Sequence, residues 1–443
     1  MKGYRLFLFL LFHLSCLVGQ ETKELNLSVP DFTKPMIRFI RVYGEKSELE
    51  PPVIVVSDER TAVPTGLKSD KVVIEFDVAS KVPPNLFARF IHCSFDWKED
   101  ENIFINEATA YRTSNIFWES APISSKYYNF RGKIIVPNEQ VKFKFSGNWK
   151  VKLYDYSEPE VALAEARFFV INPIANVQMR FYSSFYKPER NVTASAYDIE
   201  VLVTASSRAK LIENYLHTVV LYRNHRWFEP FVISMNNPTT DYFRYKFTVS
   251  IFGFVSNGKV FRIEGVPAEN GYRVIDLTNL ALFPSMNAPV RLPLSDIRRR
   301  GSFFEPHDDG AMVTRFVSPG YDDYVYIEFI LDPEGWETNE EVFLVGSFNN
   351  WKPTREWRMY YDETERIFKL RQWVRRARHN YLYATGRLGD DGNVIRVSYD
   401  EFEGNTVTSS QTFLSFVYYR NPGYGGYDEI VGFNIGTYFT SGR

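Results

Sequence analysis

Cysteine is almost absent from this chain, since only Cys16 and Cys93 occur among its 443 residues. Cys16 lies in an N-terminal segment that resembles a removable secretion signal, so we expect Cys93 to be the only thiol of the mature chain. A lone cysteine forms no internal disulfide, which excludes the disulfide-rich class of exported domains. The sequence therefore predicts that stability comes from the burial of apolar surface.

Long apolar runs are also lacking. The run over residues 6–18 is shorter than the roughly 18 residues that a transmembrane helix needs, and no later run reaches that length. Two cations precede it and small residues follow it, which is typical of a signal peptide over residues 1–20. We therefore predict an exported, periplasmic protein with no direct membrane span. A lipoprotein signal at Cys16 stays open as an alternative, although His13 occupies the position that Leu usually takes.

An excess of one charge is missing as well. The chain has 52 basic and 54 acidic residues, a formal net charge of −2. Nucleic-acid binding requires a basic surface, so this balance argues against a nucleic-acid partner.

Motifs for catalysis and metal binding are equally scarce. None of the histidines after the signal has His-x-x-x-His spacing or a neighbouring cysteine; they are His92, His217, His225, His307 and His379. No Gly-x-Ser-x-Gly elbow or phosphate-binding loop occurs. We predict a protein that is not an enzyme, with no cofactor and no metal, and we expect no small-molecule ligand. A distant pair of glycosidase carboxylates stays open, because sequence alone does not exclude one.

Aromatic residues, in contrast, are abundant at 17% of the chain. They occur in short runs that alternate with polar residues, as in residues 141–145, where two lysines separate Val, Phe and Phe. Alternation at period two is typical of half-buried strands, and aromatics suit their pleated surface. The pattern predicts an all-β protein of tandem immunoglobulin-like or early-set β-sandwich domains.

Turn signals and charge divide the chain into regions. After the signal and a polar arm, we expect an N-terminal sandwich region over residues 21–172, which an Asn-Pro turn ends. A second sandwich region covers 173–297, a charged and glycine-containing linker or long loop covers 298–323, and a C-terminal early-set-like module covers 324–443.

Cys93 is a candidate nucleophile only at first sight. If residues 87–97 form one strand, Ile91, Cys93, Phe95 and Trp97 share a face. A thiol among such neighbours has a raised pKa and is unreactive. We predict structural roles in the core for Cys93 and Trp97, and also for Trp227 and Trp351.

The hexapeptide Gly-Ser-Phe-Asn-Asn-Trp at residues 346–351 follows a short strand and precedes two more. It resembles the turn of the early-set modules attached to glycogen-branching enzymes and starch-active proteins. In glycan-binding relatives exposed Trp rings stack on sugars, and Trp351, Trp357 and Trp373 are available for that role. A glycan-binding exported protein is therefore the alternative function, although we expect Trp351 to pack under its own turn.

An ordered set of sequence blocks is similar to a second family. The blocks lie at residues 90–97, 147–155 with 168–170, 224–230, 346–351 and 416–433. Their order resembles the plug protein of the type IX secretion system over about residues 35–440. The resemblance implies a non-catalytic periplasmic protein that seals the periplasmic opening of a giant outer-membrane translocon barrel. That barrel would be its partner, and would associate it with the outer membrane.

Overall fold

The computed structural model describes residues 34–56, 64, 66–107, 111–185, 195–205, 213–234, 242–255, 258–300, 309–406 and 409–438. The predicted signal peptide over residues 1–20, with Cys16, lies outside the described residues, as does most of the predicted polar arm. His307 and the centre of the predicted linker, residues 301–308, lie outside them too.

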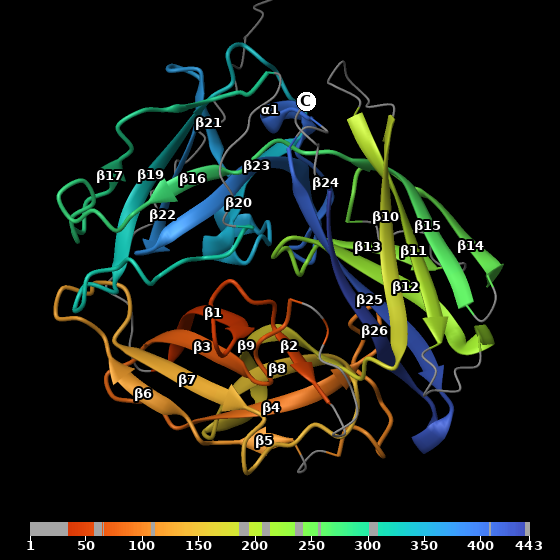
Figure 1. Ribbon diagram of the computed structural model, residues 1–443. Helices are drawn as coiled ribbons and strands as arrows, with labels where there is room; N and C mark the ends of the chain where they lie inside the picture. The colour runs from red at the N-terminus through yellow and green to blue at the C-terminus, as the bar shows by residue number, and fades with distance from the viewer. Residues whose placement is uncertain are drawn as a thin grey trace, which may run out of the picture.

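The all-β prediction is confirmed. The described residues form six sheets, which pair as three β-sandwiches around separate apolar cores (Figure 1). Helix is confined in this part of the chain to α1 (Asp400–Glu403) and single turns of 3-10 helix. No helix among the described residues has the length and apolar character that crossing a membrane requires.

The first sandwich lies at the bottom of Figure 1. One sheet has the order β1-β3-β7-β6, formed by Met36–Gly44, Val72–Ala79, Phe130–Val136 and Phe117–Ser120. The other has the order β2-β9-β8-β4-β5, formed by Val53–Val55, Glu158–Ile171, Gly147–Asp155, Leu86–Cys93 and Arg112–Thr113. Apolar side chains of both sheets meet in one core that includes Ile74, Phe90 and Phe168.

The second sandwich lies on the right of Figure 1. One sheet has the order β10-β11-β15-β14, formed by Ala175–Phe185, Ser195–Ala205, Gly258–Pro267 and Thr248–Val255. The other has the order β13-β12-β25-β26, formed by Pro230–Ser234, Leu216–Arg223, Gln411–Asn421 and Tyr427–Tyr438. Val201, Phe261 and Val417 lie in its core.

The third sandwich lies at the upper left of Figure 1. Its first sheet, β16-β23-β20 with β24 beside β23, is formed by Arg273–Asp276, Arg378–Leu388, Glu341–Gly346 and Val394–Ser398. Its second sheet, β17-β19-β22-β21 with β18 beside β19, is formed by Val290–Arg291, Tyr324–Asp332, Ile367–Arg375, Tyr360–Asp362 and Asp296–Ile297. Phe329, Leu344 and Tyr383 contribute to its core.

Strand pairing departs from the predicted region boundaries. Strands β25 and β26 fall in the predicted C-terminal module, yet β25 pairs with β12 and so completes the second sandwich. Strand β16 falls in the predicted second region, yet it pairs with β23 of the third sandwich. The third sandwich is thus inserted between two strands of the second, and two chain crossings tie these sandwiches together. The strands that pair in these sheets are distant in the sequence. The local turn signals from which the region boundaries are predicted therefore carry no information on strand pairing.

Residues 141–145 show a second departure. Val141, Phe143 and Phe145 are buried and the two lysines between them are exposed, as the alternation predicts. The segment nevertheless belongs to no strand in the described sheets. Period-two burial needs only an extended chain over a core, whereas a strand also needs a neighbour for its backbone hydrogen bonds.

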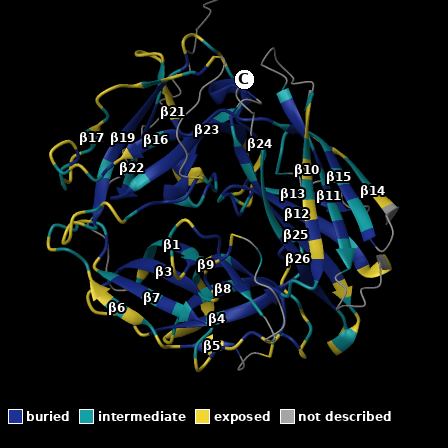
Figure 2. Ribbon diagram, in the orientation of Figure 1, coloured by how far each residue is buried: buried dark blue, intermediate teal, exposed yellow. Residues whose placement is uncertain are grey.

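The described ends of the predicted linker over residues 298–323 contact other parts of the chain. Arg299 N donates to Phe402 O at 2.8 Å, and Val313 and Arg378 form an isolated antiparallel bridge. Figure 2 shows that strands facing the other sandwiches are largely buried, whereas exposure concentrates in peripheral loops and hairpins. The three sandwiches therefore meet over a buried junction.

Candidate functional site: the junction of the three sandwiches

The four predicted structural residues are all buried. Cys93, Trp97 and Trp227 belong to one apolar cluster between the first and second sandwiches, and Trp351 belongs to another beside the third. Burial raises the pKa of the Cys93 thiol to about 12, which leaves almost no thiolate at neutral pH. The strand expected over residues 87–97 ends at Cys93, however. Trp97 reaches the cluster through a turn in which its own backbone is left-handed, with φ 65°.

We call the contact between the first and second sandwiches the aromatic seam, made of Cys93, Trp97, Phe169, Tyr222, Trp227 and Phe416 with their apolar neighbours. Phe169 of β9 stacks on Phe416 of β25 with ring centroids 4.0 Å apart. The indole N–H of Trp97 donates to Tyr222 Oη at 2.9 Å, so this buried donor has a hydrogen-bond partner. The seam therefore resembles the core of a single domain.

The Gly-Ser-Phe-Asn-Asn-Trp turn projects into the junction. Asn350 and Trp351 both have left-handed backbones, with φ 53° and 60°. The Asn350 side chain donates to Ile40 O of the first sandwich at 2.8 Å, and Trp351 Nε1 donates to Gly310 O at 2.8 Å. With 1% of its surface exposed, Trp351 has no free ring face for a sugar.

Trp351 forms one wall of an aromatic cage around Arg226 of the second sandwich. The guanidinium carbon lies 4.8 Å from the Trp351 ring centroid, 5.0 Å from Tyr272 and 4.8 Å from Tyr399. Arg226 also pairs with two buried carboxylates, Glu229 at 3.1 Å and Glu269. The positive charge of Arg226 is thus compensated by the two carboxylates and by the faces of the aromatic rings. The cage thereby links the second sandwich to the third.

The two carboxyls of the cage differ in pKa. Burial alone disfavours both charged forms, but the charges of Arg223 and Arg226 outweigh it and lower the pKa of Glu269. For Glu229 burial dominates and its pKa is raised. Different charged neighbours thus shift the pKa values of two similar carboxyl groups in opposite directions.

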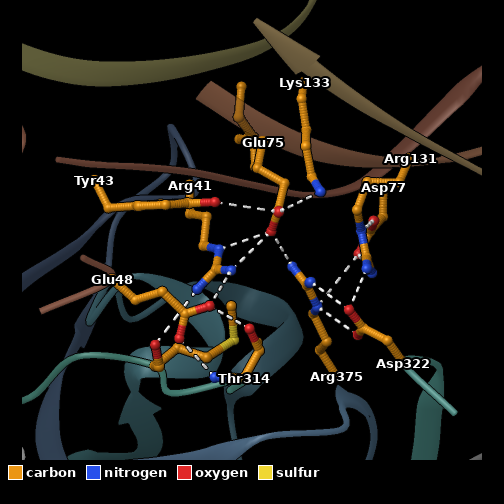
Figure 3. Close-up of polar contacts among 12 residues, drawn as sticks. Arg41, Tyr43, Glu48, Glu75, Asp77, Arg131, Lys133, Thr314, Asp322 and Arg375 are labelled. Atoms are coloured by element: carbon orange, nitrogen blue, oxygen red, sulfur yellow. Dashed lines mark hydrogen bonds and ion pairs between the residues drawn. The ribbon is translucent and has the colours of Figure 1, made fainter. Parts of the chain in front are cut away.

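We call the contact between the first and third sandwiches the ionic seam, made of Arg41, Glu48, Glu75, Asp77, Arg131, Asp322 and Arg375 (Figure 3). Glu75 of β3 lies between Arg41, whose Nε donates at 2.9 Å, and Arg375 of β22. Asp322 accepts from Arg375 Nη2 at 2.9 Å and also pairs with Arg131. Cations and anions therefore alternate across the contact.

Asp77 completes this arrangement. Arg131 of β7 donates to it through Nε at 2.6 Å and Nη2 at 3.1 Å, a two-pronged contact. Tyr324 of β19 donates its hydroxyl to the same carboxylate at 2.8 Å. One buried aspartate of the first sandwich is thus shared with a strand of the third.

Electrostatics make the ionic seam depend on ionised carboxylates. Burial opposes the charge on Glu75, but Arg375, Arg41 and Arg131 together hold its pKa well below the ordinary value. The same balance, with Arg375 and Arg131 as the neighbours, lowers the pKa of Asp322. Removing one partner would leave an uncompensated buried charge, which is strongly destabilising.

Sequence reasoning missed these charged residues. In β3 the acids Glu75 and Asp77 alternate with apolar residues, which predicts a solvent-facing polar side, yet every residue of the strand is buried. The third sandwich covers this face, and the local sequence pattern of β3 gives no sign of that contact. The available signal was the pair of acids two residues apart in a strand, together with consecutive arginines at 375–376.

The described part of the chain brings no metal-binding cluster together. No cluster of three or more His, Cys, Asp or Glu there is placed to hold a metal ion. None of the four described histidines belongs to such a cluster. His379, for example, bonds Ser347 Oγ and Arg375 O, and burial lowers its pKa to about 4. Trp357 is buried, and Trp373 stacks with Tyr127 and Tyr326 at 5.3 and 5.1 Å. The predicted sugar-stacking rings are therefore all engaged.

Comparison with known protein families gives a match for one region of the chain. Residues 37–172 match the family model described as the type 9 secretion system plug protein 1st domain. This range is the first sandwich, from β1 to the end of β9. The resemblance of residues 324–443 to glycogen-binding modules stays a prediction.

The whole fold also resembles a solved structure, that of a hypothetical protein from Parabacteroides merdae. The TM-score is 0.73 over 91% of this chain and 97% of that one, at 17% sequence identity. At such low identity the likeness shows the fold alone. No curated protein matches the chain.

Proposed function

We propose that this chain, which carries the first domain of the type 9 secretion system plug protein family, is a non-catalytic plug. It acts in type IX secretion, and in our proposal it closes the periplasmic opening of the outer-membrane translocon barrel while no substrate passes. The observation that carries the proposal is the family match over the first sandwich.

The physical construction supports a stopper. A barrel widens with its strand number, and barrels above about 20 strands stay open unless a body fills them. A stopper must keep its shape when it is pushed against such an opening. Here the aromatic seam, the ionic seam and the inserted third sandwich join three sandwiches into one body. Independent domains on flexible linkers would deform instead.

The proposal requires no chemistry from the protein. Buried titratable groups of the ionic seam are bound to one another, as Glu75 is to Arg41 and Arg375. The cleft at the junction has a volume of only about 60 Å³, whereas ligand pockets usually measure about 300–1,000 Å³. At the junction these features favour a mechanical role over an enzymatic one, whereas open pockets of about 560 and 590 Å³ lie elsewhere on the described part of the chain.

Deletion of the gene tests the proposal. We expect the deletion strain to become permeable to vancomycin, because an unplugged giant barrel admits solutes that porins of about 16–18 strands exclude. Wild-type complementation should restore the barrier. The leak should vanish when the translocon barrel is deleted as well, since no pore is then left to seal. An equal leak in the double deletion would identify a general envelope defect and overturn the plug assignment.

The same strains address the alternative of glycan binding. A glycan-harvesting protein would give a growth defect on its glycan and leave vancomycin entry unchanged. We expect the purified protein to pass through an α-glucan resin without retention, because Trp351 is enclosed by Arg226 and Tyr272. Specific retention that Trp351→Ala abolishes in a folded protein would establish glycan binding instead.

A further inference from the structure

Two cations beside the junction lack the acidic partners that the arginines of the ionic seam possess. Arg167 of β9 and Lys352, which follows the Gly-Ser-Phe-Asn-Asn-Trp turn, contact aromatic rings instead. The Arg167 guanidinium lies 4.7 Å from the Trp97 ring centroid and 4.3 Å from that of Phe228. Lys352 Nζ lies 5.3 Å from the same Phe228 ring. Among the described residues neither cation has a carboxylate within ion-pairing distance, and Arg167 Nε is buried without a hydrogen-bond partner.

Burial makes both charges costly. It lowers the pKa of Arg167, and it lowers the pKa of Lys352 with help from the nearby Arg167 charge. Glu165 acts on both cations from a distance, but it pairs with Lys150 at 3.6 Å. Unpaired charges in partly buried surroundings are retained where an opposite charge from a ligand compensates them.

The cleft at the junction reaches Arg167 directly, and Lys352 lies near it through its contact with the lining residue Phe228. Arg167 and Phe228 line the cleft of about 60 Å³, together with Trp227 of the second sandwich and Trp351 of the third. Two acids, Glu48 and Glu165, line it as well, and they pair with Arg41 and Lys150. Space of this kind holds one water per roughly 10–15 Å³, so the cleft accommodates a few waters or a single small anionic group in their place. A sugar ring or a nucleotide exceeds it.

We infer that Arg167 and Lys352 form a docking site for a carboxylate side chain on an acidic polypeptide segment of the secretion-system partner. The guanidinium presents a rigid fork that matches a carboxylate, and the Lys352 ammonium, which contacts the same Phe228 ring, supplies a second charge nearby. Because residues of all three sandwiches line the cleft, one inserted acid would fix the orientation of the whole body. This inference rests on the proposed plug function, which supplies a polypeptide partner.

Peptide binding to the purified full-length chain tests the site. The probe is a fluorescein-labelled peptide of alternating glutamate and glycine. The control is the same peptide with glutamine in place of glutamate. At low salt we expect the glutamate peptide to bind at least about tenfold more tightly, since its charge-assisted hydrogen bonds are about twice as strong as neutral ones. Equal binding of the two peptides would overturn the site. Displacement of the glutamate peptide by low concentrations of inorganic phosphate would also overturn it, in favour of a phosphate site.

Three variants locate the binding. Lys352→Met and Arg167→Met should each weaken glutamate-peptide binding about tenfold, whereas Arg291→Met, which removes an exposed cation of β17, should leave it within about twofold. Lys352→Met should melt at the same temperature as wild type or higher, because the lost charge has no partner among the described residues. A lower melting temperature with unchanged binding would make Lys352 merely structural and reject the inference.

Complementation separates this inference from the plug assignment. In the deletion strain, Lys352→Met protein of normal abundance should restore the vancomycin barrier less well than Arg291→Met protein. Full restoration by Lys352→Met would reject the docking site and leave the plug intact. If the deletion itself causes no leak, the plug assignment fails, whatever the peptide experiment shows.

Discussion

The first sandwich makes two seams of opposite chemistry, and each supports the assembly differently. Its aromatic seam with the second sandwich buries rings such as Phe169 against Phe416. Its ionic seam with the third buries Glu75 and Asp77 against arginines. Apolar burial is non-directional and nearly independent of pH. Buried ion pairs gain little net stability but tolerate few alternative arrangements. We therefore expect the aromatic seam to supply stability and the ionic seam to fix the position of the third sandwich.

Removing a cation from the ionic seam should have the largest effect. Arg375→Met leaves the buried Glu75 and the partly exposed Asp322 with less compensation, so we expect the free energy of unfolding to fall by about 4–5 kcal/mol. Urea denaturation followed by tryptophan fluorescence measures this. The control is Arg371→Met on the same strand, whose half-exposed side chain pairs with Glu328 and should cost about 1 kcal/mol or less. Similar costs for the two variants would show that the ionic seam is not buried in solution.

Truncating the centre of the aromatic seam should cost somewhat less. Phe169→Ala removes a fully buried ring that stacks on Phe416, and we expect a loss of about 3–4 kcal/mol. The exposed Phe117→Ala of β6 is the matched control and should cost about 0.5 kcal/mol or less. A loss below 1 kcal/mol at Phe169 would mean that the first two sandwiches barely depend on each other.

Acid should distinguish the seams directly. The pKa of Glu75 is depressed in the folded state, so its contribution is complete above the ordinary value of 4.5 and is lost as the pH falls through the folded value. The cost of Arg375→Met should therefore shrink in strong acid, where Glu75 is protonated and needs less compensation. The cost of Phe169→Ala should stay constant. Unfolding measured from pH 7 downward tests this, and a pH-independent cost at Arg375 would contradict it.

The smallest effect is expected at Cys93, at the edge of the aromatic seam. Cys93→Ala should cost about 1–2 kcal/mol, because only one sulfur atom leaves a packed site. The native thiol should resist thiol reagents at neutral pH, since burial raises its pKa to about 12, and should react once urea unfolds the chain. Rapid labelling of the native protein would show that the seam opens readily.

Much of the fold follows from local pattern. Period-two alternation correctly predicts an all-β protein, and in residues 141–145 it predicts which side chains leave water. It also places Cys93 among apolar neighbours. Such predictions succeed because the alternation of side chains about an extended backbone is a property of the chain itself.

The pattern fails where a distant part of the chain supplies the partner. Residues 411–438 carry the alternation of strands, but nothing local assigns them to β12 rather than to the third sandwich. The conspicuous turn at 346–351 is found from sequence, whereas the contact of its Trp351 with Arg226 is not.

What the sequence by itself determined is therefore the class of structure, the buried thiol and the plug-family resemblance. Only the tertiary structure decided that Glu75 and Asp77, on the polar side of a strand, would be covered and paired with Arg375 and Arg131. Only the tertiary structure left Arg167 and Lys352 with ring faces in place of acids. The physical reason is that alternation shows only that the two faces of a strand differ in polarity. Which face is buried, and which charges pair, depends on the part of the chain that packs over it.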